Sequence, residues 1–140
     1  MIGALLRVPV EAVWRRIIAD LHTAGFTELT SAHIPLLRWP GPDGRRPSDV
    51  AADAGMSKQA LNYLLSQLVE TGYFTREAHP EDGRGTIVGL TRRGARLVAT
   101  TRTIVATVES ELAAELGERK FAQLRRLLVD LNATAFVTSA

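Results

Sequence analysis

The stretch "SKQALNYLLSQLVETGYFTREAHPEDGRGTIVGLT", residues 57–91, changes its pattern midway along its length. Leucines recur at helical spacing in the first half, whereas the second half places strand-forming residues on both sides of a charged loop that contains two glycines. This order predicts a helix followed by a two-stranded hairpin with an arginine near its tip.

The helix that begins near Ser57 has two different faces. At about 100° per residue, one side gathers four leucines, namely Leu61, Leu64, Leu65 and Leu68. The opposite side carries uncharged hydrogen-bonding groups, on Gln59, Asn62, Tyr63 and Ser66. Amides can pair with base edges, and Lys58 near the helix start can contact a phosphate. The face therefore suits DNA, although an ordinary solvated polar face remains an equal alternative.

The residues before this helix complete a helix-turn-helix pattern. Pro47 suits the first position of a short helix, Gly55 closes that helix, and Ser57 can cap the next one. Ala51, Gly55 and Leu61 then supply the small residue, the tight turn and the apolar anchor that two steeply crossing helices need.

The residues after Gly72 predict a wing. Strands are expected at residues 73–76 and 86–90, around the loop "HPEDGRG" at residues 79–85. Arg84 lies between glycines in this loop, and an arginine is favoured in a narrow minor groove, where the negative potential is strong. A helix in the major groove and an arginine in the adjacent minor groove would together contact one half-site of duplex DNA.

Helices are also expected on either side of this region. The first carries an apolar stripe from Val10 to Leu21 and stops at Gly25, and a second runs from Thr30 or Ser31 to Arg38, with Pro35 causing a bend or a delayed start. Residues 39–47 form a loop rich in proline and glycine. A helix of about 25 residues follows Thr91, and a break near Gly117 precedes the last helix.

Three segments together resemble the MarR family of bacterial winged helix-turn-helix transcription regulators. They are "RPSDVAADAGMSKQALNYLLSQLVETGYFTRE", "HPEDGRG" and "TIVGLTRRG", and the order of the surrounding helices extends the resemblance over nearly the whole chain. The most specific features are the "D-x-R" of Asp82 and Arg84 and the "L-T-x-x-G" that starts at Leu90. Asn62 and Tyr63 depart from the family's usual residues, so the operator sequence cannot be transferred.

The resemblance implies a mainly α fold with a small β-hairpin wing, as one MarR-like domain over residues 1–140. Within it, residues 45–92 would form the winged helix-turn-helix DNA-binding lobe, and residues 1–39 and 93–140 the helical dimerisation lobe. The implied function is transcription regulation by a homodimer that binds double-stranded DNA at a roughly palindromic operator.

The resemblance also assigns roles to residues. The recognition-helix positions are Ser57, Lys58, Gln59, Asn62, Tyr63 and Ser66. Asp82 would brace the wing and Arg84 would contact the minor groove. Many members bind a small aromatic effector between the two lobes, which makes His33 and Trp39 candidates for an effector pocket. The rival interpretations are a winged helix used for protein interaction and a DNA binder without an effector.

Composition narrows the remaining classes of function. The net charge is +2, hydrophobic residues make up 46% of the chain, and cysteine is absent, which excludes thiolate catalysis and cysteine redox sensing. No phosphate-binding loop or nucleophile motif is visible, so we expect neither an enzyme nor a cofactor. Three separate histidines, His22, His33 and His79, make a zinc site a minor alternative. Without a membrane span or signal peptide, a cytoplasmic protein is expected.

Overall fold

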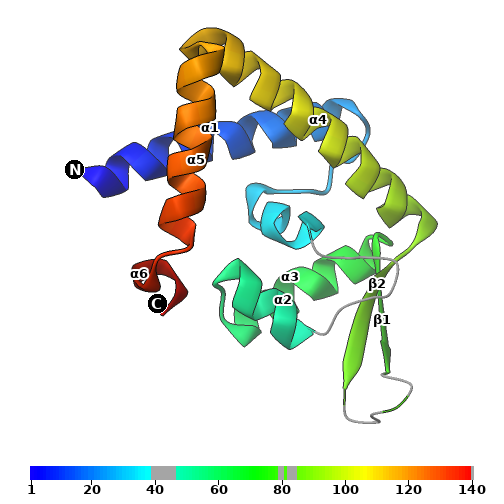
Figure 1. Ribbon diagram of the computed structural model, residues 1–140. Helices are drawn as coiled ribbons and strands as arrows, with labels where there is room; N and C mark the ends of the chain where they lie inside the picture. Colours follow the sequence, from blue (N-terminus) through cyan, green and yellow to red (C-terminus); the bar gives the residue numbers. More distant parts are fainter. Residues whose placement is uncertain (39–46, 79–80, 82–84, 140) are drawn as a thin grey trace. The chain divides into compact units, whose positions relative to one another are not determined.

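The computed structural model describes residues 1–38, 47–78, 81 and 85–139 (Figure 1). The chain forms two compact units, Met1–Ile104 and Val105–Ala140. The predicted loop after Arg38, most of the predicted wing tip, Trp39, His79, Asp82 and Arg84 lie outside the described residues.

Helix α1 spans Ile2–Thr23 and so begins before the apolar stripe on which it was predicted. Apart from Arg7, its first turns carry no polar side chain, so they lack the periodicity that marks an amphipathic helix. Pro9 lies inside the helix, where it removes one backbone donor without ending it. The predicted stop is confirmed, because Gly25 takes a φ of 97° and the N–H of Phe26 bonds the carbonyl of Leu21 at 2.9 Å.

The second predicted helix is a 3₁₀ helix, η1, over Ser31–Arg38. Pro35 was expected to bend or delay an α-helix, and it lies within this tighter form. Four of its side chains are buried and anchor it to the core, namely His33, Ile34, Leu36 and Leu37.

The helix-turn-helix consists of α2 (Pro47–Ala54) and α3 (Lys58–Glu70), as the sequence predicted. Gly55 makes the turn with a φ of 63°, a conformation that favours glycine. Ser57 is the N-cap of α3, because its Oγ accepts a hydrogen bond from the N–H of Ala60 at 3.1 Å. The side chains of Ala51 and Leu61 are buried, as the helix-turn-helix pattern requires.

The hairpin pairs β1 (Phe74–Ala78) with β2 (Thr86–Leu90) in antiparallel register, with Phe74 opposite Leu90 and Ala78 opposite Thr86. The first strand starts one residue later than predicted. Tyr73 still belongs to the helix end, since its N–H bonds the carbonyl of Leu68 at 2.9 Å and Gly72 takes a φ of 78°.

Helix α4 spans Arg92–Leu116, and its start explains the "L-T-x-x-G" pattern. The Oγ1 of Thr91 accepts from the N–H of Gly94 at 3.0 Å and donates to the carbonyl of Gly72 at 2.6 Å. A Cβ on Gly94 would lie 1.9 Å from the carbonyl oxygen of Tyr73. Thr91 therefore caps α4, and Gly94 lets α4 approach the chain after α3.

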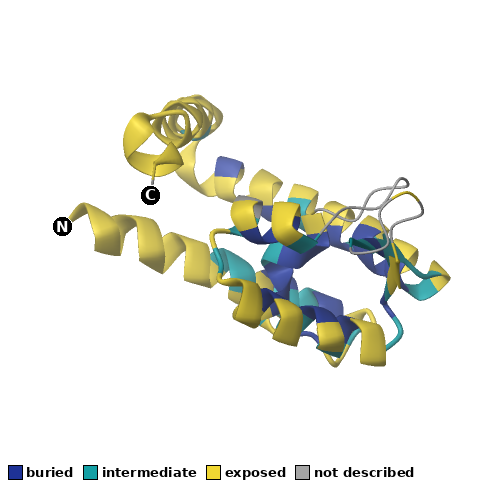
Figure 2. Cartoon of the chain, turned by 90° about the horizontal axis from the view of Figure 1, so that it is seen from below, coloured by how far each residue is buried: buried dark blue, intermediate teal, exposed yellow. Residues whose placement is uncertain are grey.

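The core of the first unit lies where η1, α2, α3 and the hairpin contact one another (Figure 2). Its fully buried side chains include Leu29, Leu36, Leu61, Leu65, Leu68, Tyr73 and Leu97. Buried leucines on α3 confirm the predicted inner face, with Leu64 only half-buried. This packing fixes which side of α3 remains open to a partner.

The second unit contains the end of α4, α5 (Glu118–Asn132) and α6 (Ala135–Thr138). The predicted break is confirmed at Gly117, whose φ is 93°. The final residues, which the sequence left open, include the short helix α6. Large apolar side chains remain exposed on this unit, including Leu124, Leu127, Val129 and Phe136. In the described part of the chain, no helix has the length and apolar character needed to span a membrane.

Candidate nucleic-acid interface

The outer face of α3 is open to solvent. Gln59, Asn62, Tyr63 and Ser66 are all exposed, and Tyr63 leaves 66% of its surface uncovered. A large aromatic ring is rarely left so exposed on a helix unless another surface covers it in the functional state. The predicted polar face of α3 therefore exists as a contiguous surface.

The N-terminal end of α3 adds positive potential to this face. Its first backbone N–H groups carry the positive end of the helix dipole, and Lys58 is exposed beside them. Because the Oγ of Ser57 already accepts from Ala60, its O–H remains available to donate to an anion. This combination suits a phosphate next to a surface that presents amides and hydroxyls to base edges.

One residue from the hairpin joins the outer face of α3. Nη2 of Arg76, on β1, donates to Oδ1 of Asn62 at 2.7 Å. The sequence did not lead us to predict Arg76 as a site residue, although the alternation of side chains along the strand indicates its position. Arg76 lies two positions after the buried Phe74, so both side chains leave the strand on the same side. The hairpin and α3 are therefore connected at the predicted contact surface.

Asp82 and Arg84, the predicted wing brace and minor-groove contact, lie outside the described residues. The hairpin that leads to them is present, and its strands frame that loop on both sides.

His33, the predicted pocket residue on η1, is buried behind α3. Its Nδ1 accepts from the N–H of Thr30 at 3.0 Å, so Nε2 carries the proton and donates to Oε1 of Gln67 at 2.9 Å. Burial lowers the pKa of His33, and the hydrogen bond that Nε2 donates to Gln67 only partly opposes this effect. The ring is thus a neutral link between η1 and α3.

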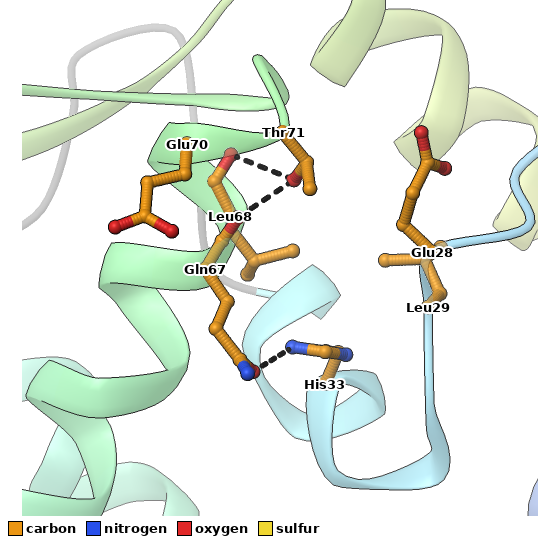
Figure 3. A pocket seen from close by; sticks show the side chains of 7 residues that line it. All are labelled: Glu28, Leu29, His33, Gln67, Leu68, Glu70 and Thr71. Atoms are coloured by element: carbon orange, nitrogen blue, oxygen red, sulfur yellow. Dashed lines mark hydrogen bonds between the residues drawn. The ribbon is translucent and has the colours of Figure 1, made fainter.

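A cavity of about 210 Å³ lies beside this link (Figure 3). Its wall comes from the Glu28–Leu29 segment, from His33 and, around the end of α3, from Gln67, Leu68, Glu70 and Thr71. In Figure 3, the hydrogen bond between His33 and Gln67 closes one side of this space. Trp39, the other predicted pocket residue, lies outside the described residues.

A second cluster joins the end of α3 to the start of α4. Glu28 accepts from the hydroxyl of Tyr73 at 2.7 Å and from Nη2 of Arg93 at 2.8 Å. Arg93 also donates to the carbonyl of Thr71 and stacks over the Tyr73 ring, 4.2 Å from its centroid. Glu28 and Arg93 are 65 positions apart, and sequence reasoning missed the pair because no local pattern links them.

The contacts within this cluster shift the pKa values of Glu28 and Tyr73. The hydrogen bonds from Arg93 and Tyr73 hold the pKa of Glu28 well below its usual range, at about 2. Burial, followed by the hydrogen bond to Glu28, raises the pKa of Tyr73 to about 12. At neutral pH, Glu28 is therefore ionised while Tyr73 keeps its proton.

His22, one of the three histidines considered for zinc, bonds the backbone. Its Nε2 lies 2.7 Å from the carbonyl oxygen of Leu29, so the ring donates to that oxygen and ties α1 to the segment before η1. His33 uses both ring nitrogens within the protein, and His79 lies outside the described residues. In the described ranges, no group of three or more His, Asp or Glu side chains is arranged to hold a metal ion.

Comparisons with known proteins agree with this geometry. The family model described as "MarR family" matches residues 27–85, which include η1, the helix-turn-helix and the first strand. An HTH-type transcriptional repressor of Mycobacterium tuberculosis is 27% identical over 89 residues, which are 64% of this chain and 64% of the repressor. The match thus spans somewhat less than two thirds of that relative's length.

Three solved structures share the fold. A MarR-family regulator from Rhodococcus sp. RHA1 is similar with a TM-score of 0.78 and 22% identity, covering 94% of this chain and 92% of that one. The repressor CouR, bound to a 23-mer DNA duplex, is similar with a TM-score of 0.75 and 23% identity, and the match covers 94% of this chain and 92% of that one. NadR in complex with 4-hydroxyphenylacetate is similar with a TM-score of 0.74 and 22% identity, and the match covers 95% of this chain and 93% of that one.

Proposed function

We propose that this chain is a MarR-family transcription regulator that binds double-stranded DNA sequence-specifically as a homodimer. The observation that carries the proposal is the exposed, uncharged outer face of α3, with Lys58 at one end and the hairpin beside it. Contacts to phosphate carry no sequence information, whereas amides and hydroxyls that bond base edges can distinguish base pairs in the major groove.

In this proposal, the contacts divide into two classes. Ser57 and Lys58 bind phosphate at the start of α3, and the side chains further along the helix contact base edges, namely Gln59, Asn62, Tyr63 and Ser66. The wing completes the half-site, with Arg84 in the minor groove and Asp82 bracing the loop. The DNA-binding lobe is residues 45–92.

The proposed dimerisation lobe is residues 1–39 and 93–140. Support comes from exposed apolar side chains at both ends of the chain, which include Ile2, Leu5 and Val8 on α1 and Leu124, Leu127 and Val129 on α5. Monomeric soluble proteins rarely expose so much apolar surface, because its burial in an interface is favourable. A two-fold axis would place two copies of α3 about one helical turn of DNA apart, which matches a roughly palindromic operator.

The cavity beside His33 supports a further part of the proposal, release from DNA by a small aromatic effector. The cavity wall includes the C-terminal end of α3, so a ligand there would act on the recognition helix directly. His33 is buried with both ring nitrogens bonded inside the protein, so it offers a ligand the apolar face of its ring, and we propose Trp39 as its companion. The structure of NadR with 4-hydroxyphenylacetate is a precedent in a protein of the same fold. Without such a ligand, the chain would be an effector-independent DNA binder.

A salt titration tests the DNA-binding proposal. Binding of a labelled duplex from upstream of the protein's own gene is measured at several salt concentrations, with a duplex of scrambled sequence as the control. We expect the logarithm of the affinity to fall linearly with the logarithm of the salt concentration, and the upstream duplex to bind more tightly. Weak, equal binding to both duplexes with no salt dependence would favour a winged helix used for protein interaction instead.

A further inference from the structure

The contact between Arg76 and Asn62 determines how the amide of Asn62 is oriented. An arginine side chain only donates hydrogen bonds, so the atom that lies 2.7 Å from its Nη2 must be the acceptor Oδ1. The amide NH₂ then remains as the open group of Asn62, since Nδ2 has no partner within the described ranges. Asn62 therefore enters any complex with its oxygen engaged and its two N–H donors available.

This arrangement changes what Asn62 can recognise. An asparagine pairs with adenine through both amide atoms, accepting from N6 and donating to N7. When Oδ1 is held by a cation, the amide is a donor, and it matches acceptors such as O6 and N7 of guanine or O4 of thymine. The charge on Arg76 also polarises the amide, which strengthens the donors that remain.

Resting on the proposed DNA-binding function, we propose that Arg76 is a positioning residue for sequence recognition. It holds Oδ1 of Asn62 so that this residue donates to an acceptor on a base edge in the major groove. Orienting the side chain before binding lowers the entropy that must be lost in the complex. Both residues are exposed, and exposed pairs contribute little to folding, so substitutions here can change recognition without unfolding the protein.

The competing explanation is that Arg76 contacts a phosphate. A phosphate contact would support every sequence equally, and its loss would reduce the slope of log affinity against log salt by about 0.9 for each contact. A positioning residue instead affects one base pair in each half-site. The two explanations therefore predict different patterns across a set of operator variants.

The experiment first selects duplexes from a random library with the wild-type homodimer, then measures affinity for every single base-pair variant of the selected sequence. The same set is measured with Asn62→Ala, with Arg76→Met and with the double variant. Arg102→Met is the matched control, because Arg102 is also exposed but lies on α4. Circular dichroism verifies that each variant is folded.

We expect Asn62→Ala to lose about tenfold or more of discrimination at one base pair per half-site, where the selected base is guanine or thymine on the contacted strand. Arg76→Met should lose most of the same discrimination, and the double variant should lose no more than Asn62→Ala alone. Asn62→Asp keeps an acceptor for Arg76 but has no N–H donors, so it should also lose this discrimination. Arg102→Met should keep the wild-type pattern.

Two results would overturn the inference while leaving the DNA-binding function intact. One is a uniform loss of affinity with Arg76→Met, a smaller salt slope and unchanged preferences at every position. The other is a selected operator in which Asn62 discriminates adenine and does so equally well without Arg76. If the wild type selects no duplex at all, the proposed function fails, and the positioning role fails with it.

Discussion

The guanidinium of Arg93 lies over the ring of Tyr73, 4.2 Å from its centroid, while both side chains bond the carboxylate of Glu28. This arrangement connects three segments of the first unit, the loop before η1, the end of α3 and the start of α4. It therefore helps to set where α3 ends and where α4 begins.

The pKa shifts of this cluster predict a pH dependence of stability. Glu28 titrates near 4.5 in the unfolded chain and at about 2 in the folded protein, so its stabilisation is complete above pH 4.5 and is lost as the pH falls towards 2. Urea unfolding of the wild type and of Glu28→Gln from pH 7 to pH 2 measures this contribution. We expect a more stable wild type at pH 7 and converging curves at low pH, whereas a constant difference would contradict the assignment.

Tyr73 predicts the opposite dependence at high pH. Its pKa is about 10 in the unfolded chain and about 12 in the folded protein, so its contribution is complete below pH 10 and is lost as the pH rises towards 12. In Tyr73→Phe, the free energy of unfolding should therefore change less between pH 9 and pH 11 than in the wild type. Absorbance of the phenolate, measured on the folded protein, provides an independent titration of the tyrosines.

His33 predicts a loss of stability in mild acid. Its folded pKa lies below the ordinary value of 6.5, so its neutral form stabilises the fold above that value, and this stabilisation is lost as the pH falls. The hydrogen bond to Gln67 favours the charged ring, but burial has the larger effect. Between pH 7.5 and pH 5, the wild type should lose more unfolding free energy than His33→Gln. Equal losses would mean that the ring is not held neutral.

A side chain added at Gly94 is expected to clash with one backbone atom. In Gly94→Ala the new Cβ would lie 1.9 Å from the carbonyl oxygen of Tyr73, so either α4 or the end of α3 must move. We expect a loss of about 3 kcal/mol in the free energy of unfolding, as for an overpacked core. Gly3→Ala is the matched control, because nothing lies within 4 Å of its Cβ and alanine favours a helix. Equal stability of both variants in thermal unfolding would contradict the close approach.

The local parts of the fold could be predicted from the sequence. Leucine spacing marked the buried face of α3, Ser57 marked its cap, and Gly25 and Gly117 marked the ends of helices, because each signal depends only on near neighbours. The start of α1 was missed because residues 2–10, apart from Arg7, show no alternation of apolar and polar faces, and η1, which contains Pro35, is a 3₁₀ helix rather than the regular helix expected.

The candidate site was predictable in its outline and not in its side-chain contacts. Exposure of Asn62 follows from the helical period, whereas its bond with Arg76 depends on how β1 packs beside α3. The pair of Glu28 and Arg93 depends on tertiary packing of distant segments, which no spacing in the sequence reveals. His33 was a candidate for an effector pocket, but its bond to Gln67 on α3 was not anticipated.

The central claim is that two copies of this chain place the outer face of α3 in successive major grooves. The absence of cysteine allows Tyr63→Cys to be labelled uniquely with an iron chelate that cleaves nearby DNA. With a selected duplex, we predict two cleavage sites centred about 10 base pairs apart, related by the operator's symmetry. The labelled control Lys120→Cys, on α5, should cleave neither site. Cleavage from residue 120 and none from residue 63 would contradict the account.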